Sequence, residues 1–171
     1  MLVESVVPLA RRRLATIGPN AVLADAALAL CDGLINLVIV CNPDGTMGGV
    51  ITTSDIIRCL SHCQCRRHES GGGGKRLHAA DMESEHRSVC ACAMSVVEVM
   101  TRDVRSCRPN VLLSDVWSLM KKERLLHVPI IDEDAKPLGV LNARDALQAL
   151  LSEVEEEEGL LRDYVMGIGY H

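Results

Sequence analysis

The chain of 171 residues is long enough for one compact domain or two small ones. Its net charge of −5 argues against nucleic acid as the main partner. No stretch approaches the roughly 18–20 uninterrupted apolar residues of a membrane span.

The chain starts with MLVESVVPLARRRLA, in which the charges follow the apolar stretch. That order does not suit a secretory signal, so we expect a cytoplasmic protein. The eight cysteines are then expected to be reduced thiols, not a disulfide framework.

The first half predicts a short N-terminal helix over 2–14 followed by the order β-α-β-β-α. A very short strand at 16–17 and a Gly-Pro-Asn turn come first. An apolar run typical of a buried strand and an Asn-Pro-Asp-Gly hairpin turn lie further on. The expected elements after the turn are helix 22–32, strand 35–41, strand 47–52 and helix 54–61.

A segment rich in glycine, cysteine and histidine follows and is expected to be partly mobile. It contains two Cys-x-Cys pairs, which are Cys63 with Cys65 and Cys90 with Cys92. Four thiolates could hold a tetrahedral zinc ion, although structural zinc sites usually space paired cysteines by two to four residues. Free thiols in a variable loop are the alternative, and no metal ligand is assigned.

The second half repeats the first without a gap, because residues 105–150 match residues 15–60 at a constant shift of 90. Each copy is too short for a generous core, so the two are expected to pack together. The second copy predicts strand 104–107, helix 111–123, strand 127–131, strand 137–141 and a helix from 144. Ten pairs of positions are identical: Pro19/Pro109, Asn20/Asn110, Leu23/Leu113, Asp25/Asp115, Val38/Val128, Asp44/Asp134, Gly49/Gly139, Val50/Val140, Asp55/Asp145 and Leu60/Leu150.

The tail beyond this copy resumes helical spacing and is expected to pack on a partner or on the core. The expected organisation has four parts. They are the N-terminal helix with repeat 1 (1–61), the insertion (62–94), repeat 2 (95–151) and a C-terminal acidic helix with the tail (152–171).

Two related motifs each end a strand and open a helix: GVITTSD at 49–55 and GVLNARD at 139–145. A helix start offers free N–H groups and a positive dipole end, which suit phosphate. An Asp suits the two hydroxyls of a ribose, so Asp55 and Asp145 are ribose candidates. Each Asp could instead be an ordinary part of a helix cap.

These motifs resemble the cystathionine β-synthase (CBS) domain family. The starts TIGPNAVLADAALAL and SCRPNVLLSDVWSLM, HVPIID before the second hairpin and VVEVMTRDV before the second copy add to the resemblance. It covers 15–61 and 96–150. It implies an α/β fold in which two β-α-β-β-α repeats pack as a pseudo-twofold pair, the Bateman module. Such pairs bind AMP, ADP, ATP or S-adenosylmethionine in two clefts between the repeats.

In the first cleft, the resemblance assigns phosphate and ribose to the first motif. Thr52 and Asp55 contact these groups, and Ser54 assists through its hydroxyl or N–H. The short strands of both copies hold the positions that usually meet adenine, which are Thr16, Ile17, Ser106 and Cys107.

In the second cleft, the resemblance places Asp145 at the ribose. Asn142 departs from the usual Thr or Ser, and Arg144 would supply a cation for phosphate. His127 lies where the family often has a basic residue facing phosphate, although a hydrogen-bonded histidine at a strand start is an equal alternative. The first copy has Leu37 there, so its cleft is expected to lack this group.

The expected function is a regulatory module and ligand sensor, not an enzyme, because no nucleophile–base pair or open metal site is evident. It binds an adenine nucleotide, requires no cofactor, forms a homodimer and signals by conformational change to a separate partner protein. The alternative is a ligand-free structural or interaction module that metal or redox state tunes through the Cys-rich insertion.

Overall fold

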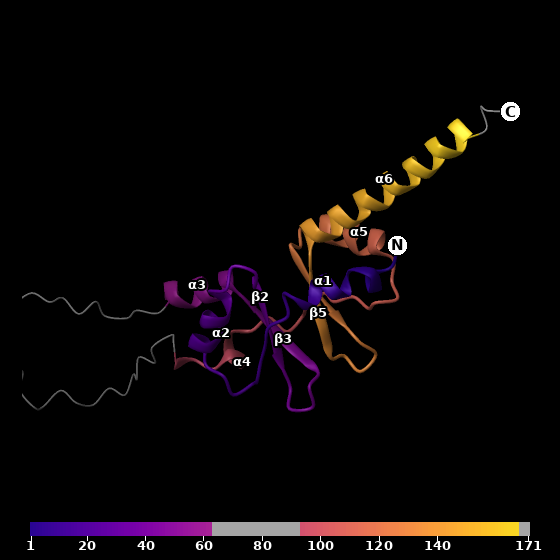
Figure 1. Ribbon diagram of the computed structural model, residues 1–171. Helices are drawn as coiled ribbons and strands as arrows, with labels where there is room; N and C mark the ends of the chain where they lie inside the picture. The colour runs from indigo at the N-terminus through magenta and orange to yellow at the C-terminus, as the bar shows by residue number, and fades with distance from the viewer. Residues whose placement is uncertain (63–92, 168–171) are drawn as a thin grey trace, which may run out of the picture.

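The computed structural model describes residues 1–62 and 93–167 (Figure 1). Two α/β halves lie side by side, and the strands of each are flanked by their own helices. The helices are η1 (3-10, Val3–Val6), α1 (Val7–Arg11), α2 (Leu23–Leu30), α3 (Thr53–His62), α4 (Val96–Val99), α5 (Leu113–Glu123) and α6 (Ala143–Gly167). The strands are β1 (Thr16–Ile17), β2 (Leu37–Cys41), β3 (Met47–Thr52), β4 (His127–Ile131) and β5 (Pro137–Asn142).

Both halves have the predicted connectivity, but their first strands differ. In the first half, β1 pairs parallel to β2, and β2 pairs antiparallel to β3. In the second half, β4 and β5 pair antiparallel, and the expected strand 104–107 is reduced to one parallel bridge between Cys107 and Ile130. Proline explains the loss. The N–H of Ile39 donates to Ala15, whereas Pro129 at the equivalent position has no N–H to donate.

The strands of the first half bury both faces. Val40 and Ile51 face the helices of their own half. Ile39 and Val50 form a cluster with Val140 of the second half, because strand side chains alternate between faces. This cluster forms the apolar seam between the halves.

The segment that precedes each half packs on the other half. Residues 1–11, which contain η1 and α1, join the core of the second half, where Val3 and Ala10 are buried with Leu113 and Leu141. The N–H of Leu113 donates to the carbonyl of Met1. The N-terminal segment therefore packs on repeat 2, although this segment precedes repeat 1 in the sequence.

Residues 94–101, which contain α4, make the equivalent connection to the first half. Val96 is buried with Leu23 and Ile51. The N–H of Leu23 donates to the carbonyl of Met94, as Leu113 does to Met1. We call residues 1–11 and 94–101 the crossed straps.

Helix α6 continues through the expected tail and projects from the body (Figure 1). Its outer apolar side chains Leu160, Leu161 and Tyr164 are 71%, 64% and 69% exposed. Of the two expectations, packing on the core is therefore wrong for these residues. Among the described residues, no helix is both long and apolar enough to cross a membrane.

Candidate functional site

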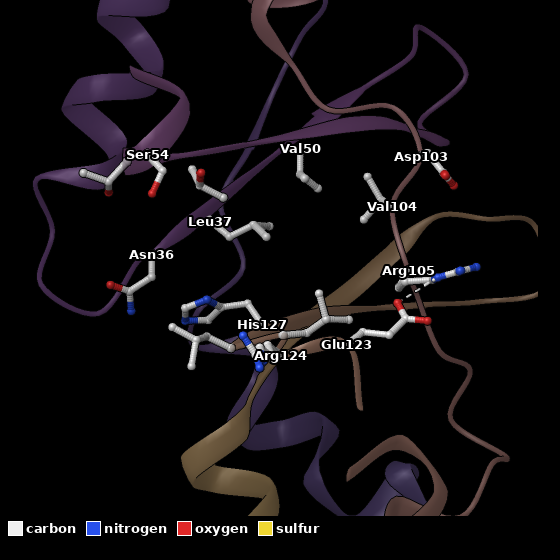
Figure 2. A pocket seen from close by; sticks show the side chains of 14 residues that line it. Asn36, Leu37, Val50, Ser54, Asp103, Val104, Arg105, Glu123, Arg124 and His127 are labelled. Carbon is white, nitrogen blue, oxygen red and sulfur yellow. Dashed lines mark hydrogen bonds and ion pairs between the residues drawn. The ribbon is translucent and has the colours of Figure 1, made fainter. Parts of the chain in front are cut away.

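A cleft of about 650 Å³ lies between the two halves (Figure 2). We call it the first cleft. Both halves contribute to its walls, so its shape depends on how they are placed relative to each other. The first half contributes Asn36, Leu37, Val50, Thr52, Thr53 and Ser54, and the second half contributes Asp103, Val104, Arg105, Glu123, Arg124, Leu125, Leu126 and His127.

The two walls of the first cleft differ in chemistry. One wall carries Thr53 and Ser54 at the N-terminus of α3, where helix N–H groups lack intrahelical partners. Arg124 and His127 lie on the opposite wall in Figure 2. The guanidinium of Arg124 has no ion-pair partner within the described ranges, whereas Arg105 is paired with Glu123 at 3.0 Å. A helix N-terminus facing a cation is suited to an anionic group.

Asp55 stabilises the start of α3. Its Oδ2 accepts from the N–H of Thr52 at 2.9 Å and from the hydroxyl of Thr52 at 2.7 Å. Arg58 lies 3.8 Å from Oδ1, and Asp55 is only 7% exposed. The capping role that the sequence left open is therefore present. The single hydroxyl proton of Thr52 is directed to Asp55. In this state, hydrogen bonds to a phosphate must therefore come from neighbouring donors.

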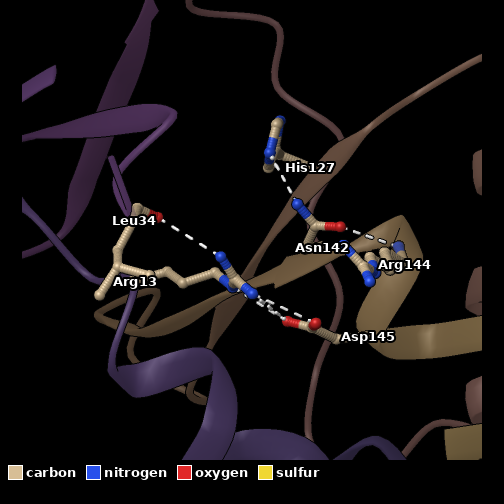
Figure 3. A network of polar contacts seen from close by, with 6 residues as sticks. All are labelled: Arg13, Leu34, His127, Asn142, Arg144 and Asp145. Atoms are coloured by element: carbon tan, nitrogen blue, oxygen red, sulfur yellow. Dashed lines mark hydrogen bonds and ion pairs between the residues drawn. The ribbon is translucent and has the colours of Figure 1, made fainter. Parts of the chain in front are cut away.

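The sister residue Asp145 has a different partner, which is Arg13 from the segment before β1 (Figure 3). The Nε of Arg13 lies 2.9 Å from Oδ2, and Nη2 lies 3.2 Å from Oδ1 and 2.9 Å from Oδ2. Both side chains are largely buried, at 21% and 11% exposure. The sequence did not single out Arg13, because it stands in a run of three arginines that reads as one basic segment.

His127 takes part in a short chain of hydrogen bonds (Figure 3). The N–H of Arg144 donates to Asn142 Oδ1 at 2.8 Å, which turns Asn142 Nδ2 toward His127 Nε2 at 3.1 Å. Nε2 must then accept, so the ring is neutral with its proton on Nδ1. Burial, together with the positive charge of Arg13, lowers the pKa of His127.

His127 also lines the first cleft beside Leu37. The structure thus differs from the expectation that the first cleft lacks this imidazole, because strands β2 and β4 start next to the same cleft. In the ligand-free state the ring is not the cation that the resemblance implied.

The residues assigned to adenine do not line the first cleft. Thr16 is exposed, and Ile17 packs against the core of the first half. Cys107 is 8% exposed within the core of the second half, and its burial raises its pKa to about 11. Ser106 directly follows Arg105, which does line the cleft.

The structure therefore brings the assigned residues together in two groups. Thr52, Ser54 and His127 line the first cleft, and Asp55 lies behind Thr52, to which it is hydrogen-bonded, outside the lining. Asn142, Arg144 and Asp145 gather at the start of α6, where Arg13 joins them.

In the described part of the chain, no group of three or more His, Cys, Asp or Glu side chains could hold a metal ion. The two Cys-x-Cys pairs considered for zinc lie outside the described residues.

A family model described as the CBS domain matches residues 96–152, which are α4 and the second repeat. The crystal structure of the CBS domain pair of protein MJ0100, in complex with 5-methylthioadenosine and S-adenosyl-L-methionine, has a TM-score of 0.63 and 19% identity. The match covers 90% of this chain and 97% of that chain. Residues 96–152 therefore contain a CBS domain, and the chain as a whole has the fold of a CBS domain pair.

Other similar proteins match this chain over a comparable length. The crystal structure of CBSX2 in complex with AMP has a TM-score of 0.63 and 19% identity, over 88% of this chain and 96% of that chain. An uncharacterized 17.7 kDa protein of Acidianus ambivalens is 23% identical over 94% of this chain and 82% of its own length. The pair arrangement thus spans both repeats, including the first, which the family model does not match.

Proposed function

We propose that this CBS pair is a regulatory module that binds an adenine nucleotide of the AMP, ADP or ATP type in the first cleft. The observation that carries the proposal is the opposition, across a cleft between the repeats, of the α3 N-terminus and Arg124, which has no ion-pair partner among the described residues. CBS pairs of the same fold have been solved with AMP and with S-adenosylmethionine.

In this proposal, each part of the nucleotide has a counterpart in the cleft or directly beside it. Phosphate oxygens accept from Ser54 and the N–H groups of α3, and Arg124 balances their charge. Asp55 accepts from the ribose hydroxyls, because a carboxylate has capacity for about four hydrogen bonds and Oδ2 already takes two. The adenine lies on the apolar wall that includes Val50 and Val104.

Signalling follows from the position of the cleft. Its walls come from both repeats, so a bound nucleotide stabilises the relative pose of the repeats that fits it best. A partner protein that distinguishes this pose from the empty one would read the signal.

We further propose that the module is a homodimer. The exposed apolar side chains Leu28 on α2 and Ile57 and Leu60 on α3, at 73%, 61% and 48% exposure, are candidates for the contact between subunits. Sedimentation equilibrium of the full chain measures the subunit number directly.

The test is a thermal-shift titration of the full chain with AMP, ADP, ATP and S-adenosylmethionine. At a ligand concentration of a hundred times the dissociation constant, binding stabilises by about 2.7 kcal/mol. For a chain of this size, that gain raises Tm by about 5–10 °C.

Asp55→Ala and Asp145→Ala form a matched pair of variants. Asp55→Ala removes the cap, which costs about 1 kcal/mol of stability and lowers the ligand-free Tm. The readout is therefore the ligand-induced shift of each variant. We expect that shift to vanish in Asp55→Ala and to persist in Asp145→Ala. A full shift in Asp55→Ala would refute the ribose assignment, and no shift with any of the four ligands would refute the nucleotide-sensing function.

A further inference from the structure

The second ribose position is already filled by the protein. We propose that Arg13, by pairing with Asp145, closes the second cleft, so that each chain binds one adenine nucleotide and not two. This inference rests on the proposed function and adds the stoichiometry and the residue that sets it.

The geometry of the pair supports closure. The guanidinium makes three N–O contacts of 2.9–3.2 Å to the two carboxylate oxygens of Asp145. Both oxygens are engaged, and planar arginine–carboxylate pairs of this kind are among the stronger polar contacts in proteins. Ribose hydroxyls would have to displace the guanidinium and leave a largely buried cation without its counter-ion.

The neighbouring polar groups of the second motif are also engaged within the protein. Asn142 donates to His127 and accepts from the N–H of Arg144, so both ends of its amide are used. In the first motif, by contrast, Ser54 faces an open cleft.

The internal repeat supplies a control. The residue 90 positions after Arg13 is Asp103, which lines the first cleft. A carboxylate there cannot form an ion pair with Asp55. The equivalent positions of the two clefts therefore carry opposite charges. At this position, a positive charge that can pair with the aspartate of the motif is present only in the second cleft.

The equivalence of these positions is structural as well as sequential. A Cβ on Gly49 would meet Met100 and Thr101, and a Cβ on Gly139 would meet Ala10 and Arg11. These neighbours are also related by the shift of 90, so the shift extends into the residues just before each repeat.

The experiment is native mass spectrometry of the full chain with saturating AMP, and with ATP in a parallel series, counting nucleotides per chain. We expect one for the wild type and two for Arg13→Ala. The matched control is Arg12→Ala, an exposed arginine one residue away, which should bind one. The double variant Arg13→Ala/Asp145→Ala should return to one, because the emptied cleft then lacks its ribose acceptor.

Arg13→Gln guards against a folding defect, since it removes the charge but keeps a long polar side chain. Circular dichroism without ligand verifies the fold of each variant, and either folded Arg13 variant is expected to bind two. Two nucleotides on the wild type would overturn the closure but leave the sensor function intact. One nucleotide on both the wild type and the folded Arg13 variants would also overturn the closure and leave the sensor function intact.

The remaining outcomes separate the two proposals. No nucleotide on the wild type but one on Arg13→Ala would support closure and reject binding in the first cleft. No nucleotide on any folded variant would overturn both.

Discussion

The crossing of strap 1–11 over β5 predicts that Gly139→Ala destabilises the fold. The added Cβ would lie 2.7 Å from the carbonyl carbon of Ala10, 2.9 Å from its Cβ and 2.9 Å from the N of Arg11. Carbon–carbon contacts are normally about 3.5–4.0 Å, so the strap would have to move by roughly 0.6–1 Å.

Overpacking of this kind costs about 1–3 kcal/mol. Alanine in place of glycine recovers about 0.4–1 kcal/mol by restricting the unfolded chain. Subtracting the gain leaves a net loss of about 0–2.6 kcal/mol, and the midpoint of about 1.3 kcal/mol lowers Tm by roughly 3–5 °C. Urea unfolding followed by circular dichroism measures it directly.

Gly33→Ala is the matched control, because nothing lies within 4 Å of its added Cβ. It should leave the stability unchanged or raise it by up to about 1 kcal/mol. Gly49→Ala tests the other strap, since its Cβ would lie 2.8 Å from the carbonyl oxygen of Thr101. If Gly139→Ala proves as stable as Gly33→Ala, strap 1–11 does not pack tightly on the second half.

Two further predictions concern titrating groups. The pKa of His127 is lowered on folding, so its contribution to stability is present above its unfolded pKa of about 6.5 and is lost as pH falls below that value. His127→Gln should therefore lose less unfolding free energy than the wild type between pH 7.5 and pH 5.5 in urea titrations, and equal losses would contradict the assignment. Burial raises the pKa of Cys107 to about 11, so only about one thiol in a thousand is ionised at pH 8. In alkylation followed by peptide mass spectrometry, exposed Cys31 should react well before Cys107, and similar rates would argue against a buried Cys107.

Much of the fold was predictable because the chain contains two copies of one pattern. Turn residues and apolar runs in one copy verify those in the other, so β2, β3, β4 and β5 lie within one or two residues of their predicted bounds. The strand at 104–107 was overestimated, because the effect of a proline depends on its pairing partner, which local sequence does not specify.

The candidate site was predictable only in part. The starts of α3 at Thr53 and of α6 at Ala143 follow from local sequence and lie within one residue of the predicted positions. The partners of Asp145 and His127 do not, since they depend on how the halves pack. The shift of 90 does extend to Arg13 and Asp103, and this charge reversal was a signal available in the sequence.

The crossed straps limit how the repeats of such a protein can be exchanged by recombination. A repeat transferred alone by recombination would leave behind the segment that covers its β-sheet, and Ala10 or Met100 would no longer cover the glycine beneath it. The smallest piece of this gene that encodes a closed core is therefore the pair with both leading segments.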